Sequence, residues 1–305
     1  MKIKARPFLK WAGGKTQLIP ELISRFPKTI IKSKKINRYI EPFVGAGALF
    51  FYVRNNFSVK RSFLFDSNKE LILAYKTIQK TPYKVITELE KLEREYLKKH
   101  EAGRAKKYYE MRASYNIQRD TVNYEKYSYR WVKRTAWMIF LNRTCFNGLF
   151  RLNSKGGFNV PQGRYKNPTI CDRDNINAVS KALRDTEIFC DDFTACKKYA
   201  TKGSLVYFDP PYRPLNGTSS FTAYTEDGFT DDDQKRLALL YRDLSKRKKV
   251  HLILSNSDPK NIIPTDTFFD DLYKKFTIER ATAIRIINCQ STKRGAVKEL
   301  IITNR

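Results

Sequence analysis

Cysteine is scarce in this chain of 305 residues, and its spacing excludes two classes of site. The five cysteines include no C-x-x-C pair, so they favour neither a disulfide framework nor a zinc site. They are Cys145, Cys171, Cys190, Cys196 and Cys289. We therefore expect inert thiols, no bound metal and a reducing compartment. The two histidines, His100 and His251, are interpreted as a surface helix residue and a strand residue.

Long apolar runs are missing as well. The longest unbroken runs, 48–53 and 136–141, have six residues each, whereas a membrane-spanning helix needs about 20. No apolar segment follows the basic N-terminus in the manner of a signal peptide. We expect a soluble protein without a membrane partner.

Acidic residues are outnumbered, with 31 Asp and Glu against 59 Lys and Arg, which leaves a net charge of +28. Such a charge indicates a polyanionic partner, although a solvated lysine-rich surface is the plainer interpretation. Clustering favours the partner: residues 123–166 hold nine basic residues and one acidic residue, a net +8, interleaved with aromatic side chains. Charge beside flat rings is typical of proteins that hold unstacked nucleotides.

What the chain does contain is enough apolar sequence for a core, at 41% hydrophobic and 13% aromatic residues. Strands are predicted at 38–43, 62–65, 187–190, 205–208 and 250–254, with a terminal hairpin at 283–288 and 297–303. Helices are predicted at 48–55 and 69–80, from Pro82 onward, at 129–142, and at 230–245 with Thr230 and Asp233 as a capping box.

Alternating strands and helices predict an α/β fold, a doubly wound Rossmann-like sheet. The alternation stops over 76–185 and then returns. We therefore predict one domain from 1–75 and 186–305, interrupted by an inserted domain at 76–185 that is mostly helical and contains a β-hairpin.

A glycine turn follows the first predicted strand, in Glu41-Pro42-Phe43-Val44-Gly45-Ala46-Gly47. Glycines there let the backbone approach a ligand closely, and Asp66, which ends the next strand, is placed to accept hydrogen bonds from a ribose. Phe50 occupies the third glycine position of the dinucleotide fingerprint. An adenosine ligand without a pyrophosphate therefore fits better than NAD.

A second glycine-containing segment, Gly13-Gly14-Lys15-Thr16, superficially suggests a phosphate-binding loop. That loop requires a glycine at position 9, which is Leu9, and a strand leading into it. Neither is present, which argues against a nucleoside triphosphatase.

The strongest motif is Asp209-Pro210-Pro211-Tyr212, directly after the apolar strand 205–208. Open α/β sheets bind ligands at the carboxyl ends of their strands. The prolines donate no N–H, so an aspartate and a neighbouring carbonyl can accept both protons of an exocyclic amino group. Tyr212 offers a flat face for a planar base. An ordinary proline turn is the alternative.

These motifs together resemble the Dam-type (D12 class) DNA adenine-N6 methyltransferases over nearly the whole chain. The resemblance rests on segments 8–15, 41–47 and 209–212, and on 141–161, which is similar to the family's target-recognition hairpin. It implies that the sheet domain is catalytic and that the insert recognises double-stranded DNA. It also implies a protein that is monomeric or weakly dimeric on DNA. The implied location is the cytoplasm of a bacterial or phage-infected cell, in association with the nucleoid.

The resemblance implies S-adenosylmethionine as the methyl donor. Lys15 would pair with the methionine carboxylate, Asp66 would hold the ribose and Asp192 would meet the adenine. The full set of implied cofactor residues is Trp11, Lys15, Phe43, Gly45, Gly47, Asp66, Asp192 and Asp209.

The resemblance also implies the reaction. Asp209 and the Pro210 carbonyl would accept from N6–H of a flipped-out adenine, while Tyr212 stacks on the ring, so that no nucleophilic side chain is needed. The implied catalytic residues are Asp209, Pro210, Pro211 and Tyr212.

For DNA contacts, the resemblance implies that Arg151 reads guanine in GATC and that Leu149 and Pro161 touch thymine methyl groups. Phe146, which replaces the tyrosine of many relatives, would fill the opened stack with Asn147. Lys10, Arg143 and Arg164 complete the implied set. Two alternatives remain: a methyltransferase for another DNA sequence or for RNA, and a DNA-binding relative that has lost the reaction.

Overall fold

The structure is a computed structural model that describes residues 3–11, 16–213, 228–284 and 296–304. The chain forms two compact units. The sheet unit comprises Lys15–Val44, Asn56–Ser67 and Asp185–Arg305. The helical unit comprises Met1–Gly14, Gly45–Asn55 and Asn68–Arg184.

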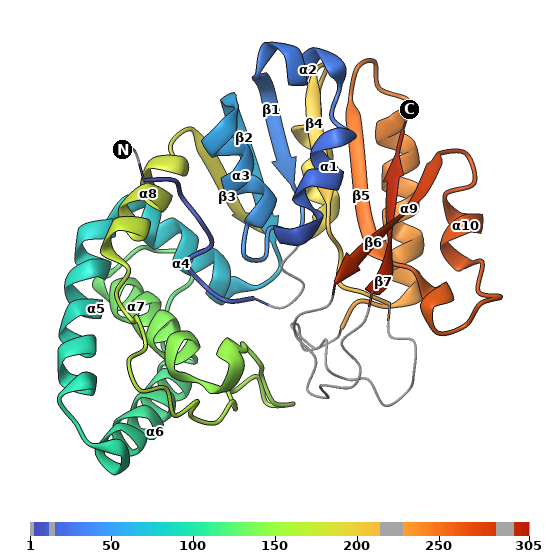
Figure 1. The fold of residues 1–305 in the computed structure, drawn as a ribbon. Coiled ribbons are helices and arrows are strands. Elements are labelled where there is room, and N and C mark those ends of the chain that lie inside the picture. Colours follow the sequence, from blue (N-terminus) through green and yellow to red (C-terminus); the bar gives the residue numbers. More distant parts are fainter. Residues whose placement is uncertain (1–2, 12–15, 214–227, 285–295, 305) are drawn as a thin grey trace. The chain divides into compact units, whose positions relative to one another are not determined.

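The sheet unit is built on one sheet of seven strands in the order β3-β2-β1-β4-β5-β7-β6 (Figure 1). The strands are β1 (Lys35–Glu41), β2 (Ser58–Asp66), β3 (Thr186–Cys190), β4 (Ser204–Phe208), β5 (His251–Ser257), β6 (Thr277–Ile284) and β7 (Ala296–Thr303). Strands β1 to β5 pair in parallel, and β7 is antiparallel to both β5 and β6. The predicted mixed α/β fold with a mostly parallel sheet is confirmed.

Helices of the sheet unit are short except for one. They are η1 (Thr16–Leu18), α1 (Ile19–Ser24), α2 (Lys28–Ser33), η3 (Phe193–Lys198), α9 (Asp231–Ser245), η5 (Pro259–Asn261) and α10 (Phe268–Leu272). Thr230 and Asp233 form the predicted capping box of α9, each side chain bonding to the other's backbone N–H. Helix α9 therefore begins where its sequence predicts.

Strand β4 is almost entirely apolar because it lies in the core of the sheet unit. All five residues of β4 are buried, as expected for a central parallel strand that is covered on both faces. On one face, Leu237, Tyr241 and Leu244 of α9 join the same buried cluster as β4 and β5. The Tyr241 hydroxyl contacts the carbonyls of Leu252 and Ile302, which fixes α9 against the sheet.

The helical unit is formed by helices α3 to α8 and one 3-10 turn. They are α3 (Ala48–Asn56), α4 (Lys69–Lys80), α5 (Pro82–Leu97), α6 (Glu101–Gln118), α7 (Tyr129–Thr144), η2 (Phe146–Gly148) and α8 (Arg173–Ala182). Helix α4 has its predicted bounds, and Asn68 caps it by accepting from Glu70 N and Leu71 N. Helices α6 and α8 lie in the segment where the sequence predicts no regular alternation.

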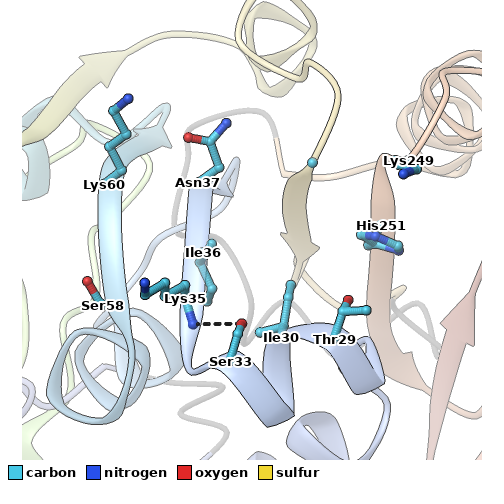
Figure 2. Close-up of a pocket in the computed structure, with 11 residues that line it drawn as sticks. Thr29, Ile30, Ser33, Lys35, Ile36, Asn37, Ser58, Lys60, Lys249 and His251 are labelled. Atoms are coloured by element: carbon cyan, nitrogen blue, oxygen red, sulfur yellow. Dashed lines mark hydrogen bonds between the residues drawn. The ribbon is translucent and has the colours of Figure 1, made fainter.

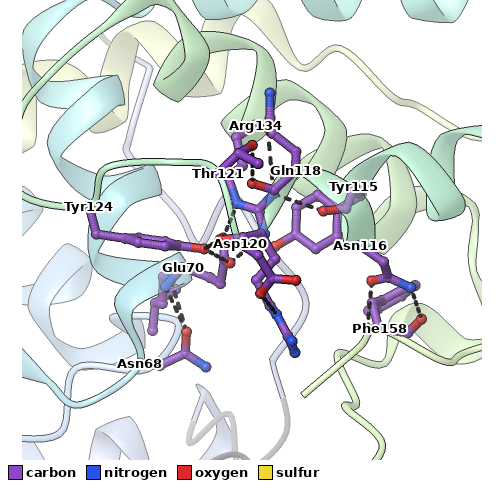
Figure 3. Close-up of polar contacts among 12 residues, drawn as sticks. Asn68, Glu70, Tyr115, Asn116, Gln118, Asp120, Thr121, Tyr124, Arg134 and Phe158 are labelled. Atoms are coloured by element: carbon purple, nitrogen blue, oxygen red, sulfur yellow. Dashed lines mark hydrogen bonds and ion pairs between the residues drawn. The ribbon is translucent and has the colours of Figure 1, made fainter. Parts of the chain in front are cut away.

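A buried ion pair between Glu70 of α4 and Arg134 of α7 ties the helical unit together (Figure 3). The Arg134 guanidinium donates to both carboxylate oxygens and to the Tyr115 carbonyl. Tyr115 and Tyr124 donate their hydroxyls to the same carboxylate. Arg134 is 1% exposed. Arg134 is therefore a structural residue, although it is part of the basic cluster of residues 123–166.

The last hairpin differs from its predicted bounds. Strand β6 runs over Thr277–Ile284, so it begins before the predicted segment 283–288, of which residues 285–288 lie outside the described range. Its sequence TIERATAI mixes polar and apolar residues, as an edge strand does, and carries too little apolar alternation to reveal its start. The assignment of 76–185 to DNA recognition stays a prediction.

Candidate functional site

The predicted acidic residues of the sheet unit gather at the carboxyl edge of its parallel strands. Asp66 is the last residue of β2, and Asp209 follows β4 directly. Asp192 follows β3 and forms the N-cap of η3. The backbone N–H of Asp191 donates to the Asp66 carbonyl at 3.3 Å, which holds the two loops together. The carboxyl edge is where open α/β sheets place their ligands.

Asp209 is half-buried and is held by β5. Ser255 Oγ donates to Asp209 Oδ1 at 3.1 Å, and the Tyr207 hydroxyl lies 2.8 Å from Ser255 Oγ. Burial, with the Asp209 charge next in weight, raises the pKa of Tyr207 well above its usual range. Tyr207 therefore stays protonated and supports the serine that orients the carboxylate.

The remaining residues of the tetrad are anchored to different elements. Gln234 of α9 donates to the Pro211 carbonyl at 3.1 Å. The Tyr212 hydroxyl donates to both oxygens of Glu299 on β7, at 2.9 and 2.8 Å. Among the described residues, none donates a hydrogen bond to the Pro210 carbonyl. The tetrad is thus fixed while this acceptor is left for another partner.

The chain leaving the tetrad is anchored as well. Arg213 makes a two-point contact with Asp231 at 2.7 and 2.9 Å, and its third nitrogen contacts Asp266 at 2.7 Å. Its guanidinium lies over the Phe268 ring at 4.2 Å. The hydrogen bonds that Arg213 donates to Asp231, opposed by burial, raise the pKa of Arg213 above its usual range. The motif is therefore held at both ends.

An aromatic cluster lies beside Asp192 in the sheet unit. The Phe43 ring stacks on Phe193 at 5.3 Å and meets Phe229 edge-on at 5.6 Å. The Arg236 guanidinium bonds both Asp192 oxygens at 3.1 Å and lies over Phe193 at 5.0 Å. Burial alone would raise the pKa of Asp192, but hydrogen bonds from Thr194 and Arg236 outweigh it and lower that pKa below its usual range. An ionised carboxylate beside stacked rings can accept from a base amine.

The glycine turn continues in the helical unit. Gly45 and Gly47 have φ angles of +47° and +70°, which L side chains rarely adopt. A Cβ on Gly47 would lie 2.6 Å from the Tyr75 hydroxyl, which donates to the Gly45 carbonyl at 3.1 Å. A Cβ on Gly45 would lie 3.3 Å from the Trp11 ring. The structure thus brings Trp11 beside this turn, while Lys15 lies outside the described residues.

The predicted recognition hairpin forms an antiparallel loop pair in the helical unit. Its arms are joined by backbone bonds from Gly163 N to Thr144 O, from Phe146 N to Pro161 O and from Asn153 N to Gly157 O. Isolated bridges pair Cys145 with Gln162 and Leu152 with Phe158. The loop pair brings together five of the predicted DNA contacts: Phe146, Asn147, Leu149, Arg151 and Pro161.

Helix α6 supports this loop pair through side-chain hydrogen bonds. Tyr108 and Arg112 both donate to the Val160 carbonyl, at 2.7 and 3.2 Å. The Asn116 side chain bonds the N–H and carbonyl of Phe158, at 2.9 and 3.1 Å. A helix that the sequence did not predict therefore positions the candidate reading residues.

The predicted DNA contacts differ in how accessible they are. Phe146 is 53% exposed, and Asn147, Arg151, Pro161 and Arg164 are also exposed. Arg151 Nε donates to Asn159 Oδ1 at 2.9 Å, which leaves its other donors to a base edge. By contrast, Arg143 is half-buried and donates to the Phe8 carbonyl at 3.1 Å. This contact of Arg143 lies within the helical unit, so its assignment to DNA binding stays a prediction.

Lys10 is held against the recognition loop. Asn142 brackets its backbone, accepting from Lys10 N at 2.8 Å and donating to Lys10 O at 2.9 Å. The Lys10 ammonium lies 5.8 Å from the Tyr165 ring centre. A Cβ on Gly148, whose φ is +66°, would meet the Lys10 side chain at 2.3 Å. The glycine is therefore required for Lys10 to cross the loop.

The sequence did not single out the residues that position the tetrad: Ser255, Gln234 and Glu299. All three are buried polar residues, a class that costs free energy unless it is hydrogen-bonded. In β5 the apolar run Leu252–Leu254 is followed directly by Ser255, and in β7 Glu299 precedes the apolar run Leu300–Ile302. A polar residue next to an apolar run of a strand is the signal that could have found these two residues, whereas Gln234 lies on helix α9 and carries no such signal.

Metal-binding groups and membrane spans are both lacking in the described part of the chain. Within the described ranges, no group of three or more His, Cys, Asp or Glu residues could hold a metal ion. None of the described helices combines the length and apolar character needed to cross a membrane.

Comparison with known proteins gives one family and several relatives. The family model of the D12 class N6 adenine-specific DNA methyltransferases matches residues 11–287. Type II methyltransferase M.MjaIII of Methanocaldococcus jannaschii is 46% identical over 99% of this chain and 100% of its own length. Type II methyltransferase M1.LlaDCHI of Lactococcus lactis subsp. cremoris is 39% identical over 99% and 96%. The DNA adenine methylase of Haemophilus influenzae is 34% identical over 98% and 94%.

Proposed function

The chain belongs to the D12 class of N6 adenine-specific DNA methyltransferases, and from this premise we propose that it transfers a methyl group from S-adenosylmethionine to N6 of an adenine flipped out of double-stranded DNA, within GATC. The observation that carries the proposal is the anchored tetrad. Asp209 is oriented by Ser255, and Tyr212 is tethered to Glu299. The Pro210 carbonyl accepts no hydrogen bond from any described group.

The reaction needs an amino group made more nucleophilic. The lone pair of adenine N6 is delocalised into the ring, so acceptors for both N6 protons favour the geometry in which that pair is available. Asp209 Oδ and the Pro210 carbonyl supply two such acceptors on consecutive residues. Because Ser255 holds Asp209 and Gln234 holds Pro211, the residues on both sides of the Pro210 carbonyl are fixed, and the amino group can be oriented without further rearrangement of the chain.

The residues at the carboxyl edge fit the donor. Asp66, at the end of β2, is proposed to accept from the ribose, and Asp192 to accept from the adenine amine beside the rings of Phe43 and Phe193. Trp11, Gly45 and Gly47 stay proposed cofactor contacts. When bound, the donor supplies an activated methyl group on a sulfonium.

Recognition is assigned to the loop pair of the helical unit. Arg151 is exposed and has donors left for guanine O6 and N7. The exposed Phe146 and Asn147 are proposed to occupy the space that the flipped adenine leaves. Unstacking costs a few kcal/mol, which contacts between basic residues and phosphates offset.

The test is methyl transfer from labelled S-adenosylmethionine to duplexes that contain GATC or the scrambled GTAC, with nucleoside analysis of the product. N6-methyladenine on the GATC duplex alone would support donor, atom and site together. A GATC duplex already methylated on both strands is the matched control and should accept no label. Equal labelling of GATC and GTAC would contradict the proposed site, and absence of label with DNA bound would contradict the proposed donor.

A recognition sequence other than GATC is the second candidate. Two relatives are named Type II methyltransferases, and Phe146 replaces the tyrosine of many family members. A panel of duplexes that vary every base of GATC in turn separates the two candidates. If labelling is highest on another sequence, that sequence is the recognition site, and the proposed reaction still stands.

A further inference from the structure

A basic pocket lies where strands β1, β2 and β5 begin (Figure 2). Asp209 instead follows the carboxyl end of β4, at the other end of the parallel strands. The strands that border it are parallel, with Lys35 of β1 opposite Ser58 of β2 and Leu205 of β4 opposite His251 of β5. The pocket has a volume of about 450 Å³ and is lined by helix α2, by residues at the starts of β1, β2 and β5, and by Gly203 and Lys249 just before β4 and β5. It therefore sits at the amino edge of the sheet, which the proposed reaction does not use.

The charge of the lining is of one sign. Lys35, Lys60, Lys249 and His251 line the pocket, and no acidic residue does. The three lysines are exposed, and none of them forms an ion pair with a carboxylate in the part of the chain that the structure describes. Their ammonium groups are thus available to an external anion.

The pocket is the centre of a larger basic face. The segments that surround it, 28–37, 58–61, 201–204 and 246–251, contain eleven Lys and Arg residues and no Asp or Glu. Of these, Arg61 pairs with Glu187, and Arg247 approaches Asp243 at 4.0 Å. We call these four segments the amino-edge face. Its charge far exceeds what the neighbouring carboxylates neutralise.

The lining chemistry favours phosphate over bases. Ammonium groups and the hydroxyls of Thr29, Ser33 and Ser58 donate hydrogen bonds to anionic oxygens. The apolar residues of the lining are Ile30 and Ile36, which are 7% and 2% exposed. No Phe, Tyr or Trp lines the pocket, and the His251 imidazole is the single ring in its lining. A regular sugar-phosphate backbone fits this lining better than an unstacked nucleotide.

We propose that the amino-edge face binds the phosphate backbone of a second segment of duplex DNA, distinct from the segment that is methylated. Strand β1 has seven residues, so its two ends lie about 20 Å apart. Asp209 lies at the opposite end of the parallel strands, so a duplex that places an adenine at Asp209 would have to bend around the sheet to reach Lys35 and Lys60. The inference rests on the DNA substrate of the family and not on the roles assigned to the tetrad.

Bridging between two duplexes tests the proposal. The enzyme is bound to an immobilised short duplex that contains its site, and capture of a labelled longer duplex without the site is measured. We expect wild-type enzyme to capture the label and K35Q/K60Q/K249Q to lose capture at least tenfold. The slope of log affinity against log salt for the captured duplex should fall by about 0.9 for each phosphate that the variant no longer neutralises.

The matched control removes the same charge elsewhere. Lys91, Lys98 and Lys99 are exposed on or directly after α5 and line no part of the pocket. K91Q/K98Q/K99Q should capture the label like the wild type. Because all six lysines are exposed, both variants should unfold at the wild-type temperature and methylate a short duplex at the wild-type rate.

The outcomes are distinct. Absence of capture by wild-type enzyme, or equal loss in both variants, would overturn the second site. Enzyme that captures the second duplex but transfers no methyl group contradicts the proposed function alone. Methylation without capture contradicts the second site alone.

Discussion

Asp209 is the residue on which the proposed chemistry depends, and its replacement gives the first prediction. Asp209→Ala removes the carboxylate that Ser255 orients, so methyl transfer should fall more than about 100-fold. Most DNA affinity should remain, because phosphate contacts dominate binding. Single-turnover transfer and a DNA titration measure the two effects. Asp232→Ala, an exposed aspartate of α9, is the matched control, and comparable turnover by the two variants would remove Asp209 from the mechanism.

Glu299 gives a prediction about position rather than chemistry. It is 4% exposed and accepts both hydrogen bonds from the Tyr212 hydroxyl. Glu299→Ala should lower the rate of transfer by about 10- to 150-fold, because one lost hydrogen bond to a charged group is worth about 1.5–3 kcal/mol. Glu299→Gln, which keeps an acceptor, should recover part of that rate.

A double-mutant cycle with Tyr212→Phe separates this role from general stability. If Glu299 acts through Tyr212, the two losses overlap, and the double variant transfers no more slowly than the slower single variant. Additive losses would show that Glu299 acts on its own. Thermal unfolding of each variant reports any structural effect separately.

At the scale of elements, the Glu70–Arg134 pair joins α4 to α7 and, through Tyr115, to α6. Glu70→Ala leaves a buried guanidinium without its counterion, so the free energy of unfolding should fall by about 3–5 kcal/mol. Glu70→Leu/Arg134→Met removes both charges and should recover part of the loss. Denaturant unfolding measures these values. Asp232→Ala, which removes an exposed ion pair with Lys235, is the control. If Glu70→Ala lowers the free energy of unfolding no more than Asp232→Ala does, the Glu70–Arg134 pair is dispensable.

The recognition loop pair gives a prediction about specificity. Arg151→Ala should weaken discrimination at one base by about 1–3 kcal/mol while transfer to the preferred sequence continues. Transfer rates over duplexes that vary one base at a time give the profile. Lys155→Ala, in the same loop pair, should lower binding to all sequences alike. An unchanged profile for Arg151→Ala would remove it as the guanine reader.

Elements that are determined by residues close in the sequence were predicted, whereas elements that depend on packing against distant residues were not. Helix α4 was predicted to its end residues because its cap and apolar spacing lie within its own sequence. The motif order predicted the carboxyl-edge residues Asp66 and Asp209. Helix α6 was missed because its sequence is rich in Lys, Arg and Tyr, and few of its residues are buried. Its helical state is decided by packing rather than by a strong apolar stripe.

Contacts between distant residues could not be predicted from the sequence. Tyr212 and Glu299 are 87 positions apart, and Glu70 and Arg134 are 64 apart. Each pair meets only because a particular strand or helix packing brings it together, and one sequence gives no register for that packing. For the same reason, the basic residues of 123–166 were counted together although Arg134 is buried.

On the scale of the whole molecule, a net charge of +28 predicts strongly salt-dependent DNA binding. An enzyme that makes 6–10 phosphate contacts loses about 10³–10⁵ in affinity between 50 and 200 mM salt. We expect a loss in this range for a long duplex without the site. Fluorescence anisotropy over a salt series measures it. A shallow slope would show that most of the basic residues are solvated and make no phosphate contact.

The position of β7 between β5 and β6 also bears on how the protein is made. Among the described strands, β7 is synthesised after the others, and it alone of these strands pairs with β6; it also carries Glu299. While the nascent chain emerges, β1 to β5 can pair, but β6 has no partner. Tyr212 has no Glu299 to bind until β7 has been synthesised. The sheet and the contact between Tyr212 and Glu299 are therefore completed only after β7 has emerged and has entered between β5 and β6.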